Sequence, residues 1–339
     1  MIRALNHAGY RVYIATQGPQ QTLLQKEFPD NPFLSLPGYQ VRYSRSKGWL
    51  PFKIMQQLPA LLRIVQWEHC WLEEAIEQYG IDLVISDNRY GLWTKKCRTV
   101  FITHQLQIKA PFLWLEHIIQ RIHYRFIERF NACWVPDQEE GNGLAGTLSH
   151  PNRKPAIPVT YIGLLSRFYA SNSINKKQIT VLLSGPEPQR TLLEEKIIAQ
   201  LSSIHKEVLL VRGLPAAMDN ITVPPHIKAV NHLTAEALQA VLENSSIVIA
   251  RSGYSSMMDF SRLHCTTILI PTPGQTEQEY LAKRCEQKGY AIHAEQLDLD
   301  LNQALAKAES NTVVFPSFHF FEETDLEGLI AALPVKASF

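Results

Sequence analysis

Cysteine is scarce and scattered in this chain. Only five cysteines occur among 339 residues, and no two of them form a C-x-x-C pair. An odd number of widely spaced cysteines argues against a disulfide framework and against a zinc site, and it favours a reducing compartment.

Long apolar runs and an excess of charge are missing as well. No stretch approaches the roughly 20 uninterrupted apolar residues of a membrane-spanning helix, and the first residues lack the basic and apolar regions of a signal peptide. The formal net charge is +1, which gives no overall attraction to nucleic acid. We therefore expect a cytoplasmic protein without a nucleic-acid partner.

The chain does contain short apolar runs that alternate with helical patterns, as in α/β folds with parallel sheets and crossover helices. The expected strands are 12–16, 82–86, 99–103, 132–135, 179–183, 207–211, 246–250 and 267–270. The expected helices are 54–79, 112–130, 187–201, 234–243, 255–263 and 276–288. The segment 149–158 carries three prolines and no periodicity, so it is the best candidate for a linker between two domains.

The N-terminus has an unusual pattern. Residues 1–9 read as the end of a helix with Gly9 just past it, and a strand follows at once. A crossover helix between parallel strands should itself follow a strand. We therefore expect that the first strand of the N-terminal domain and its loop are missing, and the alternative is a fold that begins with a helix.

The strongest local signal lies between Ser246 and Asp259. An apolar strand runs into Arg251-Ser-Gly-Tyr-Ser-Ser256 and then into a helix. Free N–H groups at such a helix start favour an anion, and glycine allows a phosphate to approach the backbone. The alternative is a well-capped helix with an acidic first turn.

Two further strand-to-helix turns resemble this one. Strand 267–270 leads into Pro271-Thr-Pro-Gly-Gln-Thr-Glu-Gln278, where Thr276 and Glu279 have the spacing of a capping box. Strand 179–183 leads into Ser184 and Gly185, a weak signal that also fits a simple tight turn. Carboxyl ends of parallel strands meet at one edge of a sheet, which is where doubly wound folds bind ligands.

The sequences 251–259 and 270–278 together resemble the donor site of GT-B glycosyltransferases of family 28, which includes the bacterial enzyme that adds N-acetylglucosamine to lipid-linked muramyl-pentapeptide. The resemblance covers about residues 179–292. It implies that the glycine loop and its helix hold the diphosphate, that an acidic residue binds the ribose, and that a Gln-containing helix lies by the sugar. The resemblance assigns the diphosphate to Ser252, Gly253, Ser255 and Ser256. It assigns the ribose to Asp259, and the sugar to Glu277 and Gln278. The family usually has Glu where this chain has Asp259.

Other positions complete the candidate sites. Val230-Asn-His232-Leu233 resembles the loop whose backbone reads the base. The expected donor-binding set also includes Ser184, Gly185, Arg251 and Gln275. On the acceptor side, Asn88, Tyr90, Gly91 and His104 follow expected strands. His104 is a candidate catalytic base, although a lone histidine there is more often structural. The glycine-rich loop with a histidine that the family carries near its first strand has no counterpart here.

Two segments of the N-terminal half combine basic and aromatic residues. Between Asp30 and Glu68 the chain has no acid, but it has Arg42, Arg45, Lys47, Lys53 and Arg63 interleaved with Tyr43, Trp49 and Phe52. In 112–130, His117, Arg121, Arg125 and Arg129 form a ridge beside an apolar stripe. Either segment fits an anionic acceptor or membrane headgroups, or an ordinary solvated surface.

The resemblance implies a GT-B fold, in which two Rossmann-like doubly wound domains face each other across a cleft. We expect an acceptor domain at 1–155, a nucleotide-sugar-binding domain at 156–320, and a C-terminal helix in 321–339, within a helical stretch of about 318–332, that packs back on the first domain.

The expected function is sugar transfer from a nucleotide-diphosphate donor, UDP-sugar being favoured, to a sugar or lipid-linked acceptor of the cell envelope, with peripheral contact to the inner leaflet. We expect no cofactor, and we expect no metal because we find no acidic metal-binding constellation such as an Asp-x-Asp. The alternatives are a nucleotide-sugar hydrolase or epimerase, and a non-catalytic binding protein or a fragment that needs a partner.

Overall fold

The computed structural model describes residues 1–36, 50–110, 112–170, 178–204, 206–215, 221–311 and 313–334. The chain divides into two compact units: unit 1 comprises Met1–Leu165 with His319–Phe339, and unit 2 comprises Ser166–Phe318. The division falls after Leu165, whereas the sequence placed the domain boundary at 155/156. The basic and aromatic positions 42, 43, 45, 47 and 49 lie outside the described residues, as do the side chains of Phe52 and Lys53.

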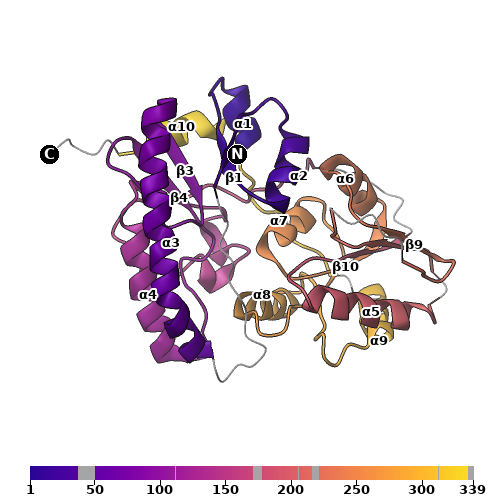
Figure 1. Ribbon diagram of the computed structural model, residues 1–339. Helices are drawn as coiled ribbons and strands as arrows, with labels where there is room; N and C mark the ends of the chain where they lie inside the picture. The colour runs from indigo at the N-terminus through magenta and orange to yellow at the C-terminus, as the bar shows by residue number, and fades with distance from the viewer. Residues whose placement is uncertain are drawn as a thin grey trace. The chain divides into compact units, whose positions relative to one another are not determined.

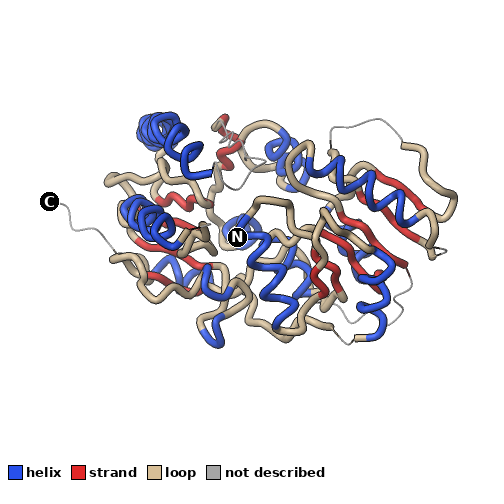
Figure 2. Tube along the Cα trace, turned by 90° about the horizontal axis from the view of Figure 1, so that it is seen from below, coloured by secondary structure: helices blue, strands red, loops and turns tan. Residues whose placement is uncertain are grey.

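Unit 2 is built on one sheet of parallel strands in the order β12-β11-β10-β7-β8-β9. The strands are β7 (Gln178–Leu182), β8 (Val208–Val211), β9 (Ile227–Val230), β10 (Ser245–Ala250), β11 (Thr267–Leu269) and β12 (Ile292–His293). The helices are α5 (Gln189–Leu201), α6 (Ala235–Glu243), α7 (Tyr254–Arg262), α8 (Thr276–Gln287) and α9 (Leu301–Ser310). In Figure 2 the strands of this unit (red) form a layer with helices (blue) on both sides.

The strand order of unit 2 indicates which edge of the sheet would bind a ligand. The chain adds β8 and β9 on one side of β7, then returns to add β10, β11 and β12 on the other. The crevice at the carboxyl ends of β7 and β10, where the direction of winding reverses, is the usual ligand site of such sheets. Apolar residues of β7, β10 and β11 pack against α5 and α9 in one core beneath this edge.

Unit 1 contains two separate parallel sheets. The larger has the order β3-β4-β5-β6, and the smaller pairs β1 with β2. The strands are β1 (Ile14–Thr16), β2 (Phe33–Ser35), β3 (Leu83–Asp87), β4 (Arg98–Ile102), β5 (Ala132–Val135) and β6 (Val159–Tyr161). The helices are α1 (Ile2–His7), α2 (Pro19–Glu27), α3 (Leu50–Tyr79), α4 (Leu113–Ile127), α10 (Asp325–Ala331) and the short 3₁₀ turns η2 (Glu140–Asn142) and η3 (Gly146–Leu148). None of the helices in the described ranges combines the length and apolar content that spanning a bilayer requires.

The two ends of the described chain pack together in unit 1. Leu326 and Ile330 of α10 share an apolar cluster with Ala4 and Leu5 of α1 and with β4 and β5. Figure 1 shows α10 (yellow) beside α1 (indigo). Gly9 follows α1 with φ 80°, the left-handed conformation that the sequence predicted after this helix.

The expected strands and helices are all found, and the differences are informative. The sequence missed α2, α9, β2, β6, β9 and β12. The strands among these are short, and β9 and β12 include Lys228 and His293, so no apolar run marks them. The helical stretch expected at 318–332 contains α10 at Asp325–Ala331 only, because residues 319–321 instead bond with Leu164 near β6.

A buried histidine makes unit 1 sensitive to acid. The His123 ring bonds the Gln105 carbonyl through Nε2 at 2.8 Å and the Tyr90 hydroxyl through Nδ1 at 2.8 Å. Because a carbonyl only accepts, Nε2 carries the proton and the Tyr90 hydroxyl donates to Nδ1. Burial lowers the pKa of His123 to about 4.

We therefore expect the free energy of unfolding of unit 1 to fall by about 2 kcal/mol between pH 7 and pH 5. The folded pKa lies below the unfolded value, so this stability is present above about pH 6.5 and is lost as the pH falls towards 4. Urea unfolding at several pH values measures it. His123→Phe should flatten the profile over this range, whereas Tyr90→Phe, which keeps the buried imidazole, should not. Equal profiles for both variants would contradict the assignment.

Candidate functional site at the carboxyl edge of the unit 2 sheet

Two helix starts lie side by side at this edge. The Ser252 hydroxyl, at the end of β10, donates to the Gln278 carbonyl of α8 at 2.8 Å. Gly253 is the N-cap of α7, and no described side chain makes a capping hydrogen bond to that helix. A Cβ at Gly253 would meet none of the described atoms within 4 Å, so a ligand could approach the backbone there. The structure thus brings together the two turns that the sequence singled out.

Arg251 is a buried cation that no carboxylate of the described residues neutralises. It is 2% exposed, and its guanidinium donates to the carbonyls of Ile270, Pro271 and Gln189 at 2.9–3.2 Å. Within the described ranges no carboxylate pairs with it, and its Nε has no partner. Burial lowers the pKa of Arg251 to about 10, so the side chain remains charged at neutral pH.

A second unsatisfied polar atom lies next to Arg251. Thr272 follows β11 and is 2% exposed, and its hydroxyl also has no hydrogen-bond partner among the residues that the structure describes. A Cβ at Gly185, which follows β7 with φ +100°, would lie 3.6 Å from the Thr272 hydroxyl and 4.0 Å from Arg251 Nε. Loops after three neighbouring strands therefore converge on one small space, and a buried donor without a partner there is costly unless a ligand satisfies it.

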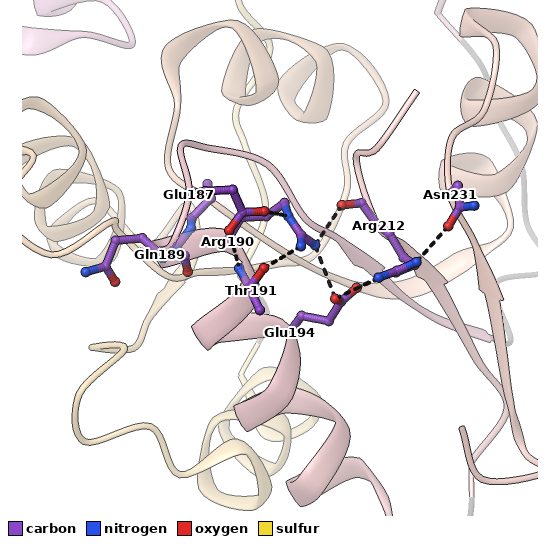
Figure 3. Close-up of polar contacts among 8 residues, drawn as sticks. Glu187, Gln189, Arg190, Thr191, Glu194, Arg212 and Asn231 are labelled. Carbon is purple, nitrogen blue, oxygen red and sulfur yellow. Dashed lines mark hydrogen bonds and ion pairs between the residues drawn. The ribbon is translucent and has the colours of Figure 1, made fainter. Parts of the chain in front are cut away.

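A network of ion pairs lies beside this space (Figure 3). Arg212, just after β8, donates to both oxygens of the Glu194 carboxylate at 2.7 and 3.2 Å. Arg190 Nη1 lies 3.3 Å from the same carboxylate and 3.4 Å from the Arg212 carbonyl. Arg190 Nε also contacts Glu187 at 2.5 Å. Two buried arginines thus share one buried carboxylate, with the exposed Glu187 at the rim.

The network continues to the loop expected to read the base. Arg212 Nη1 donates to the Asn231 side chain at 2.9 Å, and the Leu214 amide donates to the Asn231 carbonyl at 2.8 Å. His232, which is exposed, and the half-buried Leu233 follow directly. The loop after β9 is therefore held at two points by Arg212 and Leu214 of the segment after β8, two residues that the sequence pattern did not single out.

Most polar groups at the start of α8 are occupied internally. The Gln278 amide accepts from the Thr272 amide at 2.9 Å and donates to Gln275 at 2.5 Å. The helix begins at Thr276 as expected, but the capping-box prediction is wrong, because Gln275 is the N-cap and the Glu279 carboxylate accepts from the Gly274 amide. Glu277 and Gln275 are half-buried in this turn.

Asp259 lies on α7 away from solvent, with its carboxylate already occupied. One oxygen accepts from the Ser166 hydroxyl and the Arg167 amide, and the other accepts from Arg167 Nε at 3.0 Å. Burial raises the pKa of Asp259, and Arg167 opposes this shift. Ser255 is exposed and Ser256 half-buried on the first turn of the same helix.

We expect Asp259→Ala to lower the free energy of unfolding of unit 2 by roughly 1–3 kcal/mol, because it removes charge-assisted hydrogen bonds to Ser166 and Arg167. Arg167→Ala is the matched variant, since it breaks the same ion pair and leaves the carboxylate. Calorimetric titration with UDP separates the roles. A ribose contact predicts weaker binding in Asp259→Ala than in Arg167→Ala, and equal binding would leave Asp259 a structural residue only.

The acceptor-side candidates lie in unit 1 and have mixed surroundings. Tyr90 is stacked on Phe101 with its hydroxyl bonded to His123. Gly91 is buried, and a Cβ there would lie 2.4 Å from that of Glu68. Asn88 is exposed with φ 55°, and His104 is half-buried in the loop after β4. Tyr90 and Gly91 are thus engaged in packing, whereas Asn88 remains open to a ligand.

The expectation that the sequence has no Asp-x-Asp is wrong, because it contains one such triplet, Asp298-Leu-Asp300. Both aspartates are exposed, and Asp300 caps α9 by accepting from the Gln303 amide at 2.9 Å. Across the described residues, no three His, Cys, Asp or Glu side chains gather as metal ligands.

Comparisons with known proteins agree with this architecture. Residues 190–314 match the model of the Glycosyltransferase family 28 C-terminal domain. No curated protein sequence matches the chain. Among solved structures, the glycosyltransferase SnogD from Streptomyces nogalater aligns with a TM-score of 0.58 at 14% identity, over 91% of this chain and 85% of that one.

Two other solved structures give the same result. The calicheamicin glycosyltransferase CalG4 has a TM-score of 0.59 at 11% identity, over 92% of this chain and 85% of its own. The spinosyn rhamnosyltransferase SpnG, complexed with thymidine diphosphate, has a TM-score of 0.57 at 15% identity, over 91% and 87%. The chain therefore has the two-domain α/β fold of the GT-B glycosyltransferases, and its residues 190–314 match the C-terminal domain of glycosyltransferase family 28.

Proposed function

We propose that this protein transfers a sugar from a nucleoside-diphosphate donor, which unit 2 binds, to an acceptor hydroxyl. One observation carries the proposal: the buried cation Arg251 has an unpartnered Nε beside Gly185, at the edge where the winding of the sheet reverses. A diphosphate supplies the negative charge and the acceptor oxygens that Arg251 and Thr272 lack. The match to the family 28 C-terminal domain supports the same ligand class.

The neighbouring groups fit the charge of such a donor. The uncapped N-terminus of α7, with Gly253 facing open space, offers backbone N–H groups to the diphosphate. Ser255 and Ser256 add hydroxyls, while Glu277 and Gln278 lie on the turn assigned to the sugar. As the bond to the sugar breaks, negative charge grows on the leaving diphosphate. Arg251 and the helix start stabilise that charge, and a base such as His104 takes the proton from the acceptor hydroxyl.

The finer assignments are part of this proposal. We favour a UDP-sugar, and the thymidine diphosphate bound by SpnG supports a nucleoside-diphosphate site of this general form. The acceptor is a sugar or a lipid-linked glycan of the cell envelope, the reaction needs no metal, and the protein works in the cytoplasm.

Calorimetry with UDP, dTDP and GDP, followed by turnover of the corresponding sugars with EDTA or Mg²⁺, tests the proposal. We expect micromolar binding of one nucleotide, and transfer only when acceptor is present. Rapid loss of donor without acceptor indicates a hydrolase or epimerase, and binding without turnover under any acceptor indicates a binding protein. If EDTA abolishes transfer and Mg²⁺ restores it, metal independence is wrong, and if no nucleotide binds, the site assignment is wrong.

A further inference from the structure

The turns after β7 and β8 pack closely against each other. Gly213, which follows Arg212 with φ +70°, allows this approach, because a Cβ there would lie 2.3 Å from the Leu183 carbonyl oxygen. The Leu183 amide also donates to the Val211 carbonyl at 2.9 Å. The segment that carries Arg212 is therefore held against the turn that contains Gly185, beside the space proposed for the diphosphate.

The side chain of Arg212 has a defined orientation, as Figure 3 shows. Its Nε and Nη2 donate to the two oxygens of Glu194, and a contact at two points sets the plane of the guanidinium. Its Nη1 donates to the side-chain oxygen of Asn231 at 2.9 Å. The pair with Glu194 therefore aims Nη1 at the loop after β9.

This group of charges is buried, although burial is costly for charge. Arg190, Glu194 and Arg212 are each between 5% and 8% exposed. Buried ion pairs gain little stability over apolar side chains of the same volume, and their best-attested use is to fix one arrangement of a structure. Here the arrangement that depends on Arg212 is the position of Asn231, the first residue of the loop after β9.

The loop after β9 lies within reach of a nucleoside whose diphosphate is bound beside Gly185. Strands β7, β8 and β9 are neighbours in the sheet. Neighbouring strands are about 4.8 Å apart, so β9 lies roughly 10 Å from β7, a gap that a ribose can bridge. Bases differ in the positions of their hydrogen-bond donors and acceptors, so a loop must be held in place to favour one base over another.

We infer that Arg212 is a positioning residue that acts through Asn231 to hold the loop after β9 in the arrangement that selects the base of the nucleoside diphosphate. The inference rests on the proposed function, since it requires a nucleotide in unit 2, but it concerns the base alone. Arg212 acts on neither the diphosphate nor the transferred sugar. Its loss should therefore weaken nucleotide binding and leave the chemical step unchanged.

Calorimetric titration of the full chain with UDP, dTDP, GDP and inorganic pyrophosphate tests the inference, because pyrophosphate lacks a base. Asn231→Ala removes the acceptor of Arg212 and leaves the pair with Glu194 intact. We expect it to weaken binding of the preferred nucleotide about tenfold, the scale of one hydrogen bond to a charged group. The three nucleotides should become closer in affinity, and pyrophosphate binding should not change. In transfer assays the KM for the donor should rise while kcat stays the same.

Further variants separate positioning from damage to the fold. Asn231→Asp keeps an oxygen that accepts from Arg212, so it should restore most of the affinity. Arg212→Lys keeps the charge but loses the guanidinium fork, so it should weaken binding like Asn231→Ala. The double variant should bind no more weakly than either single variant, because both changes break the same hydrogen bond. Asn244→Ala is the matched control, since it removes an exposed amide at the far end of α6, and it should bind every probe like the parent.

Three results with Asn231→Ala would overturn the inference. They are equal losses for UDP and pyrophosphate, an unchanged preference among the three nucleotides, and a fall in kcat without a rise in KM. A parent protein that binds none of the nucleotides would show instead that the proposed function is wrong, and the inference would fail with it. A parent that binds one nucleotide, together with an Asn231→Ala protein that binds it equally well, would contradict the inference alone.

Discussion

Arg251→Met should weaken the binding of UDP, or of whichever nucleoside diphosphate proves to be the donor, by about 100-fold. Hydrogen bonds to charged groups contribute roughly 1.5–3 kcal/mol, and here the cation is buried, which strengthens its attraction to a diphosphate. Turnover should fall at least as much, because the leaving diphosphate carries more charge in the transition state. Isothermal titration and initial rates measure the two effects.

The controls separate charge from packing. Arg251→Lys keeps the cation but loses the guanidinium fork, so it should restore part of the affinity. Lys283→Met removes one charge from an exposed position of the same unit and should change neither constant. If Arg251→Met binds the diphosphate like the parent, the space beside Gly185 is not the phosphate site.

Glu194→Gln should lower the free energy of unfolding of unit 2 by roughly 3–5 kcal/mol. Removing one partner of a buried ion pair leaves uncompensated charge, and this variant leaves two buried guanidiniums, Arg190 and Arg212, close together. Chemical denaturation of the full chain, followed by a probe in unit 2, measures the loss.

The neighbouring Glu195 supplies the matched control, because it is exposed on the same helix. Glu195→Gln should change stability by less than about 0.5 kcal/mol. Should the two variants prove equally stable, the network of Figure 3 contributes little to unit 2. A Glu194→Gln protein that keeps its stability but loses affinity for UDP would show that the network matters only for positioning the loop at Asn231.

The arrangement of the turns at the carboxyl edge of the unit 2 sheet could be predicted because it follows from local sequence pattern. A strand of β-branched residues that runs into Arg251-Ser-Gly specifies a buried strand and a tight turn, and the parallel sheet brings the next turn alongside. The unsatisfied hydroxyl of Thr272 could not be predicted, since it depends on which groups the Gln278 amide occupies.

Prediction from the sequence failed mainly for side chains whose partners are distant in sequence. Arg190 and Glu194 have the spacing of an ordinary surface pair on a helix, and only the arrival of Arg212 from the next strand shows that the pair is buried. Asp259 was placed on the correct helix, but Arg167, which occupies its carboxylate, comes from a segment with no pattern of its own. The buried hydrogen bonds of His123 could not be predicted for the same reason, because its partners Tyr90 and Gln105 lie in separate loops.

The return of α10 to unit 1 reverses the usual order of events during synthesis. Domains generally fold as units in the order in which the ribosome releases them. Here Leu326 and Ile330 complete the apolar cluster around α1, so that cluster stays open until α10 has been synthesised. Unit 2 is continuous in sequence, so it can fold while unit 1 still lacks α10.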